Sequence, residues 1–126
     1  MIVGLTVGCW DRLHAGHSAH LSRCMMSCDL LIVGVMSDEW MRGAKGVSDP
    51  RPALARRDTI MRRFGMSLPV ILDVPDLSAY APVVRRLFIG EDQWWHTLRC
   101  NAGLPEPVVI PRTPGISSTD LRRRDP

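Results

Sequence analysis

Two histidines near the start of the chain have side chains and a spacing that suit phosphate chemistry. His14 and His17 are three residues apart in the segment HAGH, with Gly16 between them. The segment follows an apolar run that predicts a strand and precedes a pattern that predicts a helix, so both imidazoles should lie at a helix entrance. Free backbone N–H groups and the positive end of the helix dipole favour a phosphate there. The two rings could then donate hydrogen bonds to phosphoryl oxygens.

Taken alone, the histidine pair also has two simpler interpretations. The residues could be ordinary polar side chains at a helix start, or two ligands of a metal that would need Asp11 as a third. Catalysis of phosphoryl transfer comes mainly from positioning and from neutralising the developing charge, and a histidine pair is adequate for that. A second motif is needed to choose among these interpretations.

The second motif lies near the other end of the sequence. Ser117, Ser118 and Thr119 precede an aspartate and a leucine, which predicts a helix N-cap. Hydroxyl and backbone N–H groups at such a cap can hold an anion beside Arg112. Simple capping is the alternative for an isolated run of this kind.

The elements that position these residues follow from apolar patterning. Near-continuous apolar runs predict five strands, at residues 2–7, 30–36, 70–74, 86–90 and 108–111. Helical spacing predicts helices over residues 16–28 and 53–64, and the polar segment 37–52 is expected to be a functional flap. The alternation predicts an α/β fold. Residues 1–126 would form a single Rossmann-like domain with a mainly parallel five-stranded sheet flanked by helices, and ligands would bind at the carboxyl ends of the strands.

Composition narrows the class of partner. The 126 residues are 45% hydrophobic, enough for one ordinary core, and four cysteines without a CxxC pair are expected to be reduced thiols. A net charge of +3 is too mild to argue for nucleic acid but suits phosphorylated ligands. The first eight residues lack the basic start of a signal peptide, and no later stretch approaches the roughly 20 apolar residues of a spanning helix. We expect a cytoplasmic protein that does not bind membranes.

Both motifs resemble those of one family. Residues 8–17, GCWDRLHAGH, resemble the GxFDxxHxGH signature of the cytidylyltransferase-like nucleotidyltransferases, with Trp10 where phenylalanine is usual. Residues 112–119 resemble the RTxGISTT-type segment that closes over the nucleotide in that family. The resemblance covers almost the whole chain and is strongest to glycerol-3-phosphate cytidylyltransferases. It implies transfer of a nucleoside monophosphate from a nucleoside triphosphate, with CTP favoured. The acceptor would be a small phosphorylated molecule such as glycerol 3-phosphate, and pyrophosphate would be released.

The resemblance also implies roles for individual residues. His14 and His17 would stabilise the pentacoordinate transition state with help from Lys45 and Arg112, while Arg42 and Arg57 would bind the acceptor side. The nucleotide would be bound by Gly8, Cys9, Trp10, Asp11, Gly16, Gly90, Asp92, Arg112, Thr113, Gly115, Ile116, Ser117, Ser118 and Thr119. Asp11 would brace the loop, and His20 is expected to face solvent. We expect no metal site made by the protein, because Mg²⁺ would be held mainly by the triphosphate. A homodimer is implied as well.

Some residues depart from the glycerol-phosphate enzymes. Cys9 replaces their usual threonine, and residues 73–80 lack the lysine that they offer to the acceptor. The pattern GCxDxLHAGH, the pair Lys45-Gly46 and the pair Arg51-Pro52 instead resemble heptose 1-phosphate adenylyltransferases. The alternatives are therefore an adenylyltransferase acting on a sugar 1-phosphate and, from another class, a catalytically silent nucleotide- or RNA-binding module.

Overall fold

The computed structural model of the chain describes residues 1–73, 76–90 and 103–111. Within them, the strands are β1 (Val3–Gly8), β2 (Leu30–Met36), β3 (Ser67–Leu72), β4 (Arg86–Gly90) and β5 (Pro107–Ile110). The helices are α1 (Ala15–Met26), α2 (Asp38–Lys45), α3 (Ala53–Arg63) and the short 3₁₀ helix η1 (Ser78–Tyr80).

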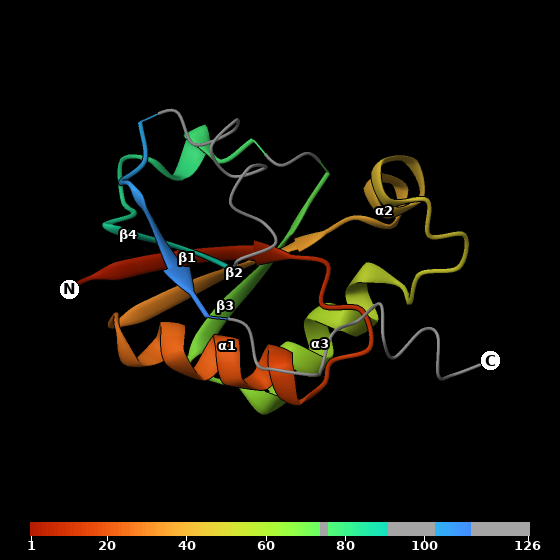
Figure 1. Ribbon diagram of the computed structural model, residues 1–126, viewed down its shortest axis with the longest axis horizontal. Helices are drawn as coiled ribbons and strands as arrows, with labels where there is room; N and C mark the ends of the chain where they lie inside the picture. Colours follow the sequence, from red (N-terminus) through yellow and green to blue (C-terminus); the bar gives the residue numbers. More distant parts are fainter. Residues whose placement is uncertain (74–75, 91–102, 112–126) are drawn as a thin grey trace.

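The five strands form one sheet in the order β3-β2-β1-β4-β5, and every neighbouring pair is parallel (Figure 1). Parallel strands covered on both faces carry continuous apolar runs, which is the pattern of β1 and β2 in the sequence. The predicted Rossmann-like α/β fold is confirmed.

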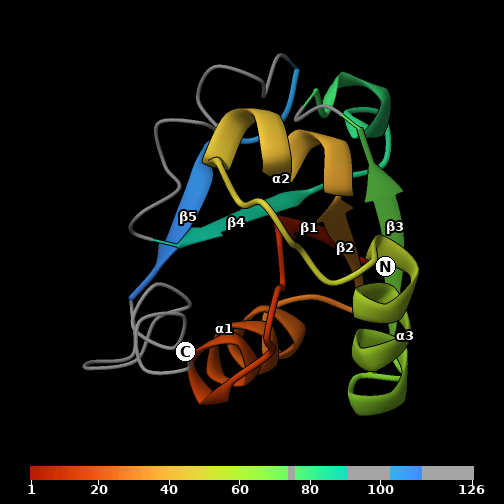
Figure 2. The same cartoon turned by 90° about the vertical axis from the view of Figure 1, so that its right-hand side faces the viewer.

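Two apolar clusters form the core, one on each face of the sheet. Helices α1 and α3 cover the same face, with η1 on the other (Figure 2). The crossovers from β1 to β2 and from β2 to β3 step in the same direction, and right-handed crossovers of that kind place their helices on one face. The α1/α3 cluster includes Leu21, Cys24, Val33, Ile60 and Phe88, and the opposite cluster includes Leu5, Ile32, Leu77, Val84 and Leu87.

The strand order reverses between β1 and β4, which fixes where a ligand can bind. The chain steps from β1 outward to β3 and then returns to the other side of β1 for β4 and β5. Open α/β sheets bind ligands in the crevice outside the carboxyl ends of the strands at such a switch point. Here those ends are Gly8 and Gly90.

The segment expected to be a flap, residues 37–52, instead begins with helix α2. The Ser37 hydroxyl caps the helix by accepting a hydrogen bond from the Trp40 backbone N–H at 3.2 Å. Asp38 and Glu39 follow in the first turn, and Gly46 ends the helix in the left-handed conformation, at φ 66°. These are ordinary cap signals, so the helix was recognisable from the sequence.

Strand β3 begins at Ser67, three residues before the predicted start. Its Pro69 is tolerated because β3 is an edge strand, where one side of the ladder needs no donor. Across the described part of the chain, no helix has both the length and the apolar character needed to cross a membrane.

Candidate active site

The loop that joins β1 to α1 carries an unusual backbone. Trp10 and Arg12 both have positive φ angles, 54° and 52°, which residues other than glycine rarely adopt. Such a conformation costs about 1–3 kcal/mol and persists only where the surroundings enforce it. Trp10 and Asp11 are buried, at 6% and 3% exposure, and together they anchor the loop.

His14 is the N-cap of α1, and this role fixes its tautomer. Its Nδ1 accepts hydrogen bonds from the backbone N–H groups of Gly16, at 3.0 Å, and His17, at 3.4 Å. A nitrogen that accepts carries no proton, so the neutral ring has its N–H at Nε2. Burial also lowers the pKa of His14, which favours this neutral form. The cap therefore presents Nε2–H as the donor toward a ligand.

The His17 ring stacks on that of His14, with the ring centroids 3.9 Å apart and an interplanar angle of 20°. Burial, reinforced by the nearby charges of His14, His20 and Lys45, lowers the pKa of His17 to about 3. His17 is therefore neutral at physiological pH. The pair can offer N–H donors to a phosphoryl group without the repulsion that two stacked imidazolium ions would suffer.

His20 does not face solvent, so that expectation was wrong. Its Nε2 lies 2.9 Å from the Thr6 hydroxyl of β1, and the indole of Trp10 lies against its ring at a centroid distance of 5.9 Å. Burial lowers its pKa to about 4. The physical reason is helical spacing, because His20 follows His17 by three residues and shares the face of α1 that packs on the sheet.

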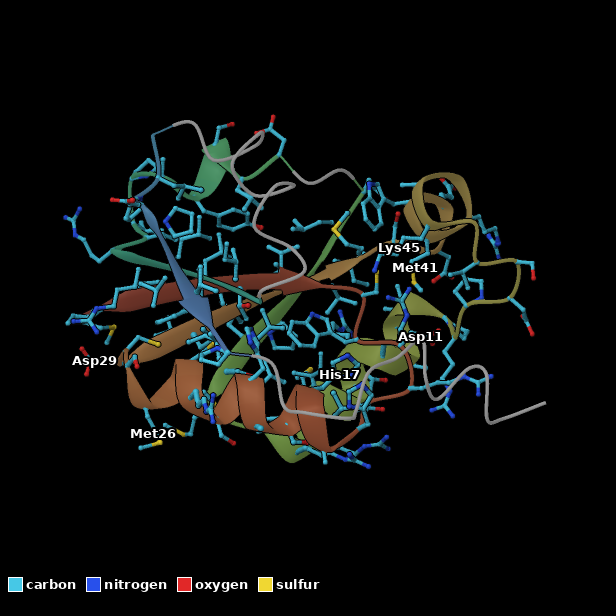
Figure 3. All side chains as sticks on the ribbon, in the orientation of Figure 1. Asp11, His17, Met26, Asp29, Met41 and Lys45 are labelled. Carbon is cyan, nitrogen blue, oxygen red and sulfur yellow. The ribbon has the colours of Figure 1, made fainter. Side chains whose placement is uncertain are left out.

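Lys45, the last residue of α2, lies close to the loop. Burial raises the pKa of the Cys9 thiol, and the charge of Lys45, together with a side-chain hydrogen bond from it, opposes that shift. Figure 3 shows Lys45, Asp11 and His17 at one end of the sheet, with Met26 and Asp29 at the opposite end. The structure thus places Lys45, which the sequence predicted to be catalytic, near the histidine pair.

The arginine that supports the site is Arg56, which sequence reasoning missed. The residue is 2% exposed, and its Nη1 donates to the carbonyl oxygens of Cys9, at 2.6 Å, and Met36, at 2.8 Å. Nη2 forms an ion pair of 2.6 Å with Asp38, and Nε donates to the Arg51 carbonyl at 2.7 Å. One guanidinium therefore ties the carboxyl ends of β1 and β2 to α2 and to the segment before α3.

Arg57, the residue selected from the sequence, lies one position further along α3. Its side chain is 37% exposed and pairs with Asp58 at 3.6 Å. Arg56 stands four residues before the buried Ile60, and this spacing places it on the inward stripe of α3. That spacing could have shown that Arg56 faces the core, but not which carbonyl groups it binds. An acceptor-binding role for Arg57 stays a prediction.

Asp11 makes the contact expected of a residue that braces the loop. Its Oδ1 accepts a hydrogen bond from the backbone N–H of Arg51 at 3.4 Å, which links the loop to the segment before α3. Gly8, at the end of β1, leaves little room for a side chain, because a Cβ atom there would lie 3.0 Å from the Trp10 ring. The end of β1 is therefore packed directly against the loop.

The remaining predicted site residues divide into described and undescribed ones. Gly16 lies in the first turn of α1, Gly90 ends β4, and Arg42 is exposed on α2. The others lie outside the described residues, and their places in the site stay predictions: Asp92, Arg112, Thr113, Gly115, Ile116, Ser117, Ser118 and Thr119. Among residues 1–73, 76–90 and 103–111, no three His, Cys, Asp or Glu side chains gather as metal ligands would.

A parallel sheet with a strand-order reversal, and a histidine pair at the helix entrance beside it, form the arrangement expected of a nucleotidyltransferase. The chain belongs to the cytidylyltransferase-like family, whose model matches residues 5–124. This confirms the family resemblance and the enzyme class predicted from the two motifs.

The curated relatives include two proteins that are each named bifunctional protein HldE. The chain is 50% identical over 128 residues to the HldE of Rhodopseudomonas palustris strain BisB5, covering 94% of this chain and 26% of that protein. It is 38% identical over 131 residues to the HldE of strain BisA53, covering 97% of this chain and 26% of that protein. The chain therefore spans only a minor part of these relatives.

Solved structures share the fold at low identity. A lipopolysaccharide core biosynthesis protein from Thermoplasma volcanium superimposes with a TM-score of 0.71 at 20% identity, covering 90% of this chain and 97% of that one. A NadR protein in complex with NAD and AMP-PNP gives a TM-score of 0.58 at 14% identity, covering 98% of this chain and 40% of that one. These similarities establish the architecture alone.

Proposed function

We propose that this chain transfers an adenylyl group from ATP to a sugar 1-phosphate and releases pyrophosphate. The observation that carries the proposal is the grouping of Cys9, Lys45 and Arg51 around one loop. The charge of Lys45 acts on the Cys9 thiol, and the Arg51 backbone N–H binds Asp11 of the same loop. These three positions are the ones by which the sequence resembles heptose 1-phosphate adenylyltransferases rather than glycerol-phosphate enzymes.

The proposed reaction needs little acid–base chemistry from the protein. An oxygen of the acceptor phosphate attacks the α-phosphorus of the nucleotide in line, and the bond from that phosphorus to the bridging β-phosphate oxygen breaks. The attacking oxygen is already anionic, so no proton has to be removed. The Nε2–H of His14 and the imidazole of His17 donate to the α-phosphoryl oxygens as charge develops on them. Lys45 and Arg112 attract the departing pyrophosphate.

A basic cavity beside the loop adds to the attraction for phosphorylated ligands. Its volume is about 70 Å³, and it lies between the loop and α3. Four arginines line it: Arg12, Arg51, Arg56 and Arg63. A concentration of one sign of charge at a concave site raises the local concentration of anions and favours their approach.

The relatives support a sugar acceptor over a polyol phosphate. The 38% and 50% identical proteins are both named HldE, and the sequence around the loop resembles that of heptose 1-phosphate adenylyltransferases. The second candidate is transfer of CMP from CTP to glycerol 3-phosphate, which residues 111–116 favour because they resemble the cytidylyltransferases. Both candidates share the chemistry at the histidine pair and differ in nucleotide and acceptor.

For the cofactor, we propose that Mg²⁺ enters with the triphosphate and is held mostly by its oxygens. The described residues offer no carboxylate cluster that would hold the ion by itself. Its contribution when bound is to neutralise negative charge on the triphosphate.

The family resemblance also favours a homodimer, which sedimentation of the purified chain would test.

The test is pyrophosphate release from a matrix of the four nucleoside triphosphates against sugar 1-phosphates and glycerol 3-phosphate. Turnover with ATP and a sugar 1-phosphate is the expected result, and turnover with CTP and glycerol 3-phosphate would select the second candidate. His17→Ala should lower the rate by roughly 100-fold or more, the scale expected when a main transition-state donor is removed. Binding of nucleotide or RNA without any turnover would identify a silent module instead.

A further inference from the structure

Trp10 is held rigidly against the rings of His17 and His20. Its indole N–H donates to the Gly34 carbonyl of β2 at 2.9 Å, and the residue is 6% exposed. The ring contacts His17 edge-to-face, with a centroid distance of 5.5 Å and an interplanar angle of 70°. It also lies against His20, which is bonded in turn to Thr6 of β1. The indole is therefore fixed from the sheet side.

The indole borders the basic cavity between the loop and α3, but little of the ring is open for a base to stack on. A ring that stacks on a base must expose a face, whereas Trp10 packs in the apolar cluster between α1 and the sheet. The rigid indole does contact His17, a ring that the proposed reaction needs in one orientation. Displacement of a reacting group by about 1 Å can lower a rate by about 100-fold.

We propose that Trp10 is a positioning residue that fixes the orientation of the His17 imidazole through its indole ring and does not stack on the nucleotide base. The indole N–H is the essential feature, because it ties the ring to β2, and the phenylalanine usual at this position in the family has no such donor. The inference rests on the proposed role of His17, and it replaces the nucleotide-binding role that the resemblance implied for Trp10.

The test is Trp10→Phe, with Trp40→Phe on α2 as the matched control. Loss of the indole N–H should lower kcat by about tenfold, less than the full cost of a 1 Å displacement, and leave KM for the nucleotide unchanged. The orientation of His17 has a second readout, the titration of its ring followed by NMR. His14, His20 and Lys45 are the charged or titratable groups that face this ring. Loosening the contact should admit water and raise the His17 pKa, whereas Trp40→Phe should change neither quantity.

Four results would overturn the proposal. A change in KM alone would place the indole in the nucleotide pocket. A lower melting temperature with kcat and the His17 titration unchanged would make Trp10 merely structural. If Trp10→Phe does not fold, the unaltered protein provides the test, because NOEs between the Trp10 and His17 rings and a neutral His17 at pH 5 are expected. Absent NOEs, or a His17 that titrates near pH 6, would contradict the proposal.

The proposed function and the inference about Trp10 can be contradicted independently of each other. If His17→Ala keeps full activity, the role of His17 is wrong, whatever the NMR readouts give. If His17→Ala is inactive and Trp10→Phe matches the unaltered protein in kcat and in the His17 titration, only the inference about Trp10 is wrong.

Discussion

The imidazoles of His14 and His17 stack nearly parallel, with their centroids 3.9 Å apart. Stacking at this distance is compatible with two neutral rings and opposes a pair of cations. The contact therefore selects the neutral forms, in which each ring has one N–H to donate. It also places both rings at the same helix entrance, where the dipole already favours a phosphate.

Because His14 caps α1 through Nδ1 and offers Nε2–H to the ligand, two variants should separate these roles. Asparagine is a good N-cap but has no group at the place of Nε2, so His14→Asn should keep its free energy of unfolding within a few tenths of a kcal/mol. His14→Ala should lose about 1 kcal/mol. Both should lower pyrophosphate release by roughly 100-fold. Urea unfolding and the activity assay measure the two effects, and full activity in His14→Asn would reduce His14 to a cap.

The free energy of unfolding should fall as the pH drops from 6.5 toward 5. The folded-state pKa values of His17 and His20 are about 3 and about 4, below the ordinary value of 6.5, so the unfolded chain binds more protons in this range. The slope should approach about 1.4 kcal/mol per pH unit for each histidine. Urea unfolding at several pH values measures it, and His20→Leu should remove the contribution of one histidine from the slope. Equal slopes in the two proteins would contradict the buried, neutral state of His20.

Arg56 and Arg57 form a matched pair for testing the support of the loop. Arg56→Met leaves the carbonyls of Cys9 and Met36 and the carboxylate of Asp38 without their donor, and should cost about 3 kcal/mol or more. Arg57→Met, on a partly exposed residue, should change the free energy of unfolding by about 0.5 kcal/mol or less. Chemical denaturation of both variants provides the comparison. Similar losses would mean that the Arg56 contacts do not carry the loop.

Cys9 should report on occupancy of the site. Iodoacetamide reacts with the thiolate, which the charge of Lys45 favours, so Lys45→Met should slow alkylation of Cys9 at pH 8.5. A saturating nucleotide should also protect Cys9. Cys28, after the far end of α1, is the internal control and should be unaffected by either change. Peptide mass spectrometry follows both thiols, and a nucleotide that protects Cys28 but leaves Cys9 reactive would place the ligand elsewhere.

Much of the fold and the family could be predicted from local patterns in the sequence. The apolar runs identified the five strands of the described residues, and the two end motifs led to the family, because strand burial and glycine-histidine spacing are properties of short segments. The capped helix α2 was overlooked, although Ser37 and Gly46 marked its ends. The start of β3 was placed too late, because Pro69 obscured the strand.

The sequence by itself determined the class of fold, the nucleotidyltransferase family and the position of the histidine pair at a helix entrance. Tertiary structure alone decided that Arg56 rather than Arg57 clamps the loop, that His20 is buried against Thr6, and that Trp10 packs against His17. The physical reason is that each of these contacts joins residues from different elements. Their partners are chosen by the strand order and by the face on which α1 and α3 pack, neither of which a short stretch of sequence contains.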